Sequence, residues 1–102
     1  MLLAEISMWP MDKGESVGAH VAPLLDIIDR SGLAYQLGPL GTCIEGEYDA
    51  VMALVKQCHE HLAKDSGRVV CTIKMDWRKG HAGRIEAKVR SVERAVGRGL
   101  RT

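Results

Sequence analysis

Apolar and polar residues alternate over two long stretches of the chain. The first is LLAEISM, residues 2–8, and the second is VVCTIKMDW, residues 69–77. Successive side chains of a β-strand point to opposite faces of a sheet, so this period of two predicts two strands that each bury one face. Pro10 follows the first stretch. Because proline lacks a backbone N–H, we expect it to end that strand.

Two shorter extended segments, residues 34–37 and 42–45, lie between these strands. They are joined by the tetrapeptide GPLG, residues 38–41. Glycine and proline adopt the backbone angles that tight turns require. The middle of the chain is therefore predicted to form a β-hairpin.

Apolar residues spaced three and four apart predict helices on either side of this hairpin. The first helix should follow Ser16 as its N-cap and end at Gly32. It contains Pro23, which should remove one backbone hydrogen bond and kink the axis. The second helix is predicted over residues 49–64, with Asp49 placed to favour the positive end of the helix dipole.

A third helix is predicted after the second long strand, where Glu86 and Arg90 are spaced to pair across one turn and Gly97 ends the pattern. Residues 97–102 are expected to form a flexible basic tail. The order of elements is then β-α-β-β-α-β followed by a helix. This order predicts a single α+β domain over residues 1–102, a ferredoxin-like sandwich with a four-stranded antiparallel sheet and two helices on one face.

The alternation also assigns side chains to the two faces of the sheet. The more apolar set should face the helices, because burying apolar surface stabilises the fold by about 25 cal/mol per Å². That set is Ala4, Ile6, Met8, Ile44, Val69, Cys71, Ile73 and Met75. The opposite, open face should carry Leu3, Glu5, Ser7, Leu37, Cys43, Glu45, Val70, Thr72, Lys74 and Asp76.

Composition excludes several classes of protein. Hydrophobic residues make up 46% of the 102 residues and charged ones 26%, which is typical of a globular chain. No stretch approaches the roughly 18 apolar residues of a membrane span, and MLLAEISM is not a signal peptide, so we expect a cytoplasmic protein without a membrane partner.

The three cysteines are widely spaced, which favours small buried hydrophobes over a disulfide framework or a zinc site. Cys58, His59 and His61 lie close together in the sequence, but residues one to three apart on a helix do not converge on one metal ion. No metal or cofactor is expected.

Charge is distributed unevenly, although the net charge is only +1. Residues 1–77 carry 6 basic and 11 acidic side chains, whereas residues 78–102 carry 8 basic and 2 acidic ones. Such asymmetry fits a subunit contact or a nucleic-acid surface. The central strands offer carboxylates where an RNA-binding sheet stacks bases on aromatic residues, so the pattern does not favour nucleic acid.

Two motifs carry a resemblance to a known family. GPLGTCIEGE, and the Lys-x-Asp-x-Arg pattern within RVVCTIKMDWR, resemble the small thiamine-binding protein family, formerly a family of unknown function. The resemblance covers residues 3–96. It implies a ferredoxin-like fold, homo-oligomers (dimers or tetramers, as dimers of dimers) built by packing sheets together, and binding of thiamine or its hydroxymethylpyrimidine part without a known reaction.

The resemblance also implies ligand-binding residues. Thr42, Glu45 and Gly46 match one motif, and Ser7 falls at a serine of the first strand. Lys74, Asp76 and Arg78 match the other motif. Apart from the resemblance, alternation puts Tyr35 on the same face as Leu37 and Trp9 in the row of Ser7, so both are expected to border the site. The chain departs from the family pattern at Trp9, before Pro10, and at Pro23.

An aminopyrimidine suits such residues chemically. A carboxylate such as Glu45 can accept from the exocyclic amine, and a hydroxyl of Ser7 or Thr42 can donate to a ring nitrogen. Glu5 and Asp76 would favour the cationic thiazolium of thiamine. We therefore predict a non-enzymatic binding site on the open face at a subunit interface, with no catalytic residue.

Alternative roles remain open for the same residues. Glu45 can serve the dipole of the second helix, Lys74 can neutralise Glu5 or Glu45, and Arg78 can form an intersubunit salt bridge. The alternatives for the whole protein are an interaction module without a ligand, a nucleic-acid-binding domain, and a small enzyme with Glu45 or Asp76 as general base.

Overall fold

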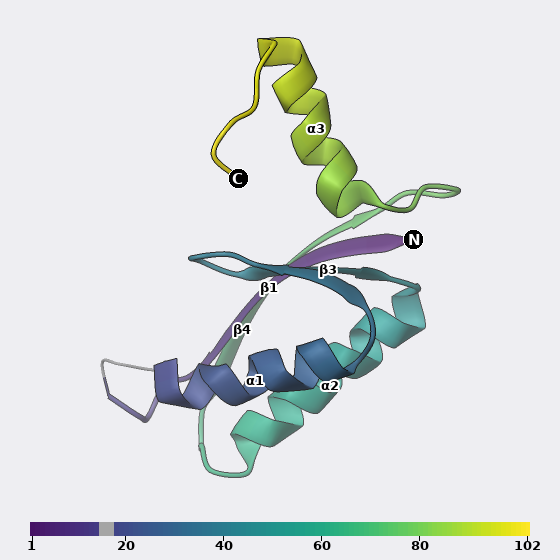
Figure 1. Ribbon diagram of the computed structural model, residues 1–102. Helices are drawn as coiled ribbons and strands as arrows, with labels where there is room; N and C mark the ends of the chain where they lie inside the picture. The colour runs from purple at the N-terminus through teal and green to yellow at the C-terminus, as the bar shows by residue number, and fades with distance from the viewer. Residues whose placement is uncertain (15–17) are drawn as a thin grey trace.

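The computed structural model describes residues 1–14 and 18–102, and it confirms the predicted order of elements (Figure 1). The strands and helices are β1 (Leu2–Pro10), α1 (Gly18–Arg30), β2 (Ala34–Leu37), β3 (Thr42–Gly46), α2 (Tyr48–Ala63), β4 (Val69–Trp77) and α3 (Arg84–Val96).

The four strands form one antiparallel sheet in the order β2-β3-β1-β4. Helices α1 and α2 cover one face, and α3 lies on the opposite side of the sheet (Figure 1). This arrangement confirms the predicted α+β, ferredoxin-like fold with one face free of α1 and α2.

The core lies between β1 and the two covering helices. Every second residue of β1 from Leu2 to Met8 is buried, as the period of two predicts. These side chains pack with Ile44 of β3 and with the apolar stripes of both helices. The buried helix residues are Leu24 and Ile28 of α1, and Val51, Leu54, Val55, Cys58 and Leu62 of α2.

Strand β1 continues two residues beyond its predicted end. Pro10 does not stop it but forms its last residue, paired with Val69 of β4. The next backbone N–H, that of Met11, donates to the carbonyl of Arg68 on the β4 side. Successive N–H groups of a strand point to opposite sides, so the nitrogen of Pro10 faces away from β4. On that side lies β3, whose pairing with β1 has already ended at Ile6. The missing donor therefore costs no hydrogen bond between strands.

The start of α1 as predicted, with Ser16 as N-cap, lies outside the described residues. From Gly18 onward the helix is continuous on both sides of Pro23. The second helix lies within one residue of its predicted bounds. Glu86 and Arg90 form the expected ion pair at 3.4 Å, and Gly97 ends α3 with a φ of 90°.

Burial of the helix-facing row of β4 is weaker than predicted. Cys71 is exposed and Met75 is 50% exposed, although both share a face with the buried residues of β1. β4 is an edge strand, and α1 and α2 cover mainly β1 and β3, so this row extends past the helices. The prediction that all three cysteines are buried is therefore wrong for Cys71, and Cys43 is only partly buried.

Candidate functional site

The open face carries the polar row that the alternation predicts. Glu5 pairs with Lys74 on one side and with Cys43 on the other. Leu3 pairs in the same way with Asp76 and Glu45, and directly paired residues share a face. Chemical groups from three strands therefore meet on this surface.

Glu45 is the most buried carboxylate on the open face, with 5% of its surface exposed. Its two carboxylate oxygens accept the backbone N–H of Arg84 at 3.1 and 3.0 Å. Arg84 is the first residue of α3, and Gly83 at the N-cap has no side chain that could cap the helix. Glu45 thus supplies the cap from a distant strand, where its negative charge also favours the positive end of the helix dipole.

Asp76 holds the same helix turn through its side chain and main chain. The Arg84 guanidinium donates to the Asp76 carbonyl at 3.0 Å and to its carboxylate, and Lys88 Nζ contacts that carboxylate at 2.7 Å. The hydrogen bond from Lys88, together with the Arg84 guanidinium, lowers the pKa of Asp76 below its ordinary value. We call Glu45, Asp76, Arg84 and Lys88 the α3 anchor.

The dipole role considered for Glu45 is therefore real, but it serves α3 and not the second helix. At the start of α2 the N-cap residue is Glu47, which makes no capping hydrogen bond with its side chain. Nor does Lys74 neutralise either glutamate: within the described chain, no salt bridge joins Lys74 to Glu5 or Glu45.

Glu5 forms no salt bridge among the described residues, and unlike Glu45 it does not accept the backbone N–H of Arg84. It is exposed and accepts only a long contact from the Cys43 thiol, at 3.9 Å. Partial burial, and secondarily the charge of Glu5, raise the pKa of that thiol. The Glu5 side chain also packs on the hairpin turn, because a Cβ placed on Gly41 would lie 3.2 Å from Glu5 Cγ.

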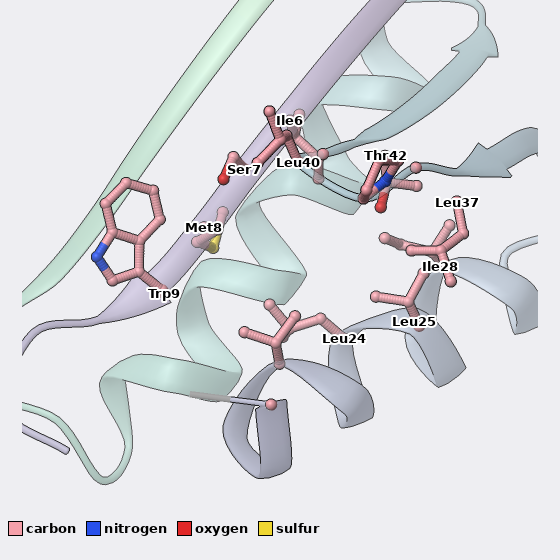
Figure 2. A pocket seen from close by; sticks show the side chains of 15 residues that line it. Ile6, Ser7, Met8, Trp9, Leu24, Leu25, Ile28, Leu37, Leu40 and Thr42 are labelled. Carbon is pink, nitrogen blue, oxygen red and sulfur yellow. The ribbon is translucent and has the colours of Figure 1, made fainter. Parts of the chain in front are cut away.

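A cavity of about 340 Å³ opens beside this turn (Figure 2). Pairing between β1 and β3 ends at Ile6 and Thr42, so the last residues of β1 leave one edge uncovered. The turn at residues 38–41 and helix α1 flank that edge and form the remaining walls.

The cavity wall is mainly apolar, with hydroxyl groups from Ser7 and Thr42. Figure 2 shows side chains of β1, α1 and the hairpin around one space, with Trp9 at its far end. The apolar lining includes Ile6, Met8, Leu24, Leu25, Ile28, Leu37 and Leu40. Among the lining residues that the structure describes, none has a titratable side chain.

The predicted ligand residues do not form one cluster. Ser7 and Thr42 line the cavity, whereas Glu45 and Asp76 lie beside Leu3. Leu3 and Ser7 are four residues apart on β1, which is about 13 Å at roughly 3.3 Å per residue. A single small heterocycle does not contact both groups over that distance.

Arg78 lies farther still from Ser7, just beyond the residue paired with Leu2. Its backbone N–H donates to the Met1 carbonyl at 3.3 Å, and its own carbonyl accepts from the N-terminal amine at 3.2 Å. Lys74 lies between the two groups, opposite Glu5. Whether these side chains contact a ligand stays a prediction.

The expected position of Tyr35 and Leu37 on the open face is wrong. Tyr35 pairs with Ile44 and Leu37 pairs with Thr42, so both lie on the side of the sheet that faces the helices. The Tyr35 hydroxyl donates to Asp29 of α1 at 2.7 Å, which raises the pKa of the phenol. Leu37 instead forms part of the cavity wall.

Arg84, which joins Glu45 and Asp76 at the start of α3, is the residue of this surface that sequence reasoning missed. Its partner Glu45 lies 39 positions earlier, and no local pattern reports such a contact. One signal was present: α3 follows Gly83, and no Ser, Thr, Asp or Asn stands where an N-cap is expected. A helix without its own cap needs an acceptor from elsewhere in the fold.

Across the described residues, no group of three or more His, Cys, Asp or Glu side chains is arranged to hold a metal ion. No helix in the same part of the chain is long and apolar enough to cross a membrane.

Fold and site define an α+β protein of the ferredoxin-like class with a small apolar cavity beside its hairpin. The sequence model of the thiamine-binding protein family matches residues 4–93, and the chain belongs to that family.

Relatives support this assignment. The UPF0045 protein MJ1052 of Methanocaldococcus jannaschii is 31% identical over 91 residues, covering 89% of this chain and 91% of the relative. The UPF0045 protein Mb1933 of Mycobacterium bovis is 37% identical over 94 residues, covering 91% and 92%.

Solved structures share the fold. The crystal structure of MJ1052 has a TM-score of 0.82 at 31% identity, over 89% of this chain and 94% of that one. TM0486 of Thermotoga maritima, named for a role in thiamine biosynthesis or salvage, has a TM-score of 0.78 at 25% identity, over 89% and 97%.

The α3 anchor generates a direct prediction. Replacing Glu45 with Ala should speed hydrogen exchange of the α3 amides by about fivefold, because losing a helix cap costs about 1 kcal/mol. Exchange is read by NMR, with Glu47→Ala as the matched control, since Glu47 is exposed and its side chain caps nothing. Unchanged α3 protection in Glu45→Ala would show that Glu45 does not hold the helix.

Proposed function

We propose that the protein binds thiamine or its hydroxymethylpyrimidine part, without catalysing a reaction, in the cavity lined by Ser7 and Thr42. The observation that carries this proposal is the cavity itself: an apolar space of about 340 Å³ with two hydroxyls, beside the Glu5 carboxylate, which forms no salt bridge within the described part of the chain. Ligand sites are commonly apolar clefts of about 300–1,000 Å³ with a few polar groups that set orientation. Family membership supports the choice of ligand.

An aminopyrimidine ring matches these groups. Its faces are apolar enough to pack between Leu25 and Ile28 of α1 and the hairpin. The hydroxyl of Thr42 or Ser7 donates to a ring nitrogen, and the Glu5 carboxylate accepts from the exocyclic amine. A cationic thiazolium, when present, also gains from the charge of Glu5.

This assignment differs from the hypothesis drawn from sequence, which placed Glu45 at the amine. Two observations support Glu5 in its place. Both Glu45 oxygens already accept the Arg84 N–H, and Glu45 lies beside Leu3, far along β1 from the cavity. Glu5 instead packs against Gly41, which forms part of the cavity wall.

Reversible binding without turnover also fits the cavity. General acid–base catalysis needs a titratable group within hydrogen-bond reach of the substrate proton. The described cavity wall offers hydroxyl groups and no titratable side chain, and the carboxylate proposed to reach the ligand, Glu5, is exposed and is assigned only to its exocyclic amine. We therefore assign it an orienting role and no general-base role.

The binding proposal is tested by isothermal titration calorimetry with thiamine and, separately, with hydroxymethylpyrimidine. We expect micromolar or tighter binding that weakens at least tenfold, about 1.4 kcal/mol, in Thr42→Val and in Glu5→Gln. Thr72→Val and Glu47→Gln are the matched controls, because both residues are exposed and lie outside the cavity. Glu45→Gln should leave affinity within a fewfold of wild type.

Two results would contradict the proposal. If neither ligand gave a heat of binding, the proposed binding function would be wrong. Loss of binding in Glu45→Gln, with Thr42→Val unaffected, would place the ligand on the open face beside the α3 anchor.

We further propose that the protein forms dimers or tetramers. The supporting observation is exposed apolar surface: Trp77 at 61% and Met75 on the edge strand β4, and Leu37 at 64% on the hairpin. Sedimentation velocity at several concentrations should show a species of at least twice the 11.2 kDa chain mass. A single species of chain mass at high micromolar concentration would contradict this.

A further inference from the structure

Three arginines border a second hollow, which lies between the last turns of α3 and the segment that follows the helix. We call it the arginine hollow; its volume is about 460 Å³, and its lining is Arg90, Glu93, Arg94, Gly97, Arg98 and Gly99. The described linings of this hollow and of the cavity beside the hairpin have no residue in common. The family model ends at residue 93, so most of the arginine hollow lies beyond the part of the chain that it matches.

Helix geometry and one glycine turn bring the three arginines to the same hollow. Arg90 and Arg94 are four residues apart on α3, so they share a helix face and are separated by about 6 Å along its axis. The helix ends at Gly97, whose φ of 90° is a left-handed conformation that favours glycine. The chain turns back there beside α3, and Arg98 reaches the hollow (Figure 1).

Glu93 holds this turned-back segment in place. Its backbone carbonyl accepts the N–H groups of Gly97 and Arg98 at 2.8 and 3.2 Å. Its carboxylate accepts the N–H of Leu100 at 2.6 Å. Because these hydrogen bonds already order the segment, a ligand that contacts Arg98 does not have to pay for folding it.

The arginine hollow has an excess of positive charge. Within the described residues, Arg94 and Arg98 form no salt bridge, and Arg90 forms one only with Glu86, at 3.4 Å. Exposed pairs at this spacing are weak, so Arg90 can exchange Glu86 for a ligand. Three guanidinium groups then stand against the single carboxylate of Glu93 in the lining.

Stabilisation of the helix dipole does not account for all three arginines. A cation in the last turn offsets the negative end of a helix, and Arg94 is placed for that role. Arg90 lies a full turn earlier, where that effect has decayed, and it borders the same hollow. The convergence of the arginines therefore points to an anion.

Guanidinium groups recognise phosphate with a planar fork of N–H donors. A chain of two or three phosphoryl groups can span the rise of about 6 Å between Arg90 and Arg94 and still reach Arg98. Its several negative charges would match several arginines better than one phosphate would. The volume of the hollow lies within the usual range for small-molecule sites, about 300–1,000 Å³.

We propose that the arginine hollow binds the linear polyphosphate group of a small molecule, such as a nucleoside triphosphate. The site is separate from the cavity proposed for thiamine, and this inference does not rest on the ligand of that cavity.

The test is isothermal titration calorimetry of the full chain with inorganic tripolyphosphate and, separately, with adenosine triphosphate, at about 150 mM salt. We expect saturable binding of tripolyphosphate to one site per chain. Arg94→Gln and Arg98→Gln should each weaken that binding at least threefold, and the double variant at least tenfold. Tighter binding of the nucleotide than of tripolyphosphate, lost in the same variants, would identify a nucleotide as the source of the polyphosphate.

Two further variants separate a specific site from general attraction of charge. Arg30→Gln removes the same charge from an exposed position of α1, outside the hollow, and should keep the wild-type affinity. Arg94→Lys keeps the charge but loses the planar fork, so it should bind more tightly than Arg94→Gln and more weakly than wild type.

Three results would overturn the proposal. The first is no binding of either probe at this salt concentration. The second is that Arg30→Gln weakens binding as much as Arg98→Gln does. The third is that single-stranded RNA binds through the same arginines more tightly than tripolyphosphate, which would make a nucleic acid strand the partner. Hydroxymethylpyrimidine should bind Arg94→Gln and Arg98→Gln as it binds wild type, so the failure of either proposal leaves the other standing.

Discussion

The contact between the Glu45 carboxylate and the first N–H of α3 is the interaction on which the arrangement of this protein depends. A carboxylate that is 5% exposed must be satisfied by donors, and here both oxygens accept the same backbone N–H. The contact joins the end of β3 to a helix that otherwise stands away from the sheet (Figure 1). Arg84 is buried to the same extent and ties Asp76 into the contact. The side chains at this end of the open face therefore hold α3 in place.

The opposite end of the sheet is then free for the proposed ligand. β1 continues past the point where β3 ends, and the uncovered edge, the hairpin turn and α1 enclose an apolar cavity. Ser7 and Thr42 supply hydroxyls there, and Glu5 supplies a carboxylate that the α3 anchor does not use. The motif GPLGTCIEGE thus serves two purposes. Its first half, residues 38–42, forms part of the cavity wall, and Glu45 caps α3.

Much of the fold follows from local sequence patterns, because β1 and β4 have clear contrast between apolar and polar positions. β2 has only the four residues AYQL, so alternation alone cannot determine which face Tyr35 takes; only the register with β3 does. The site is harder to predict for the same reason. Both the cavity and the Glu45–Arg84 contact arise where segments distant in sequence meet, and neither leaves a periodic signal.

We propose separate roles for the two ends of the sheet, with α3 anchorage at Glu45 and ligand binding at Thr42. Backbone amide NMR spectra recorded during titration with hydroxymethylpyrimidine distinguish these roles. We expect the largest shifts on Ser7, on residues 38–42 and on α1 near Leu25, with Arg84 nearly unchanged. Shifts concentrated on Glu45, Asp76 and the first turn of α3, with the cavity residues unmoved, would contradict this proposal.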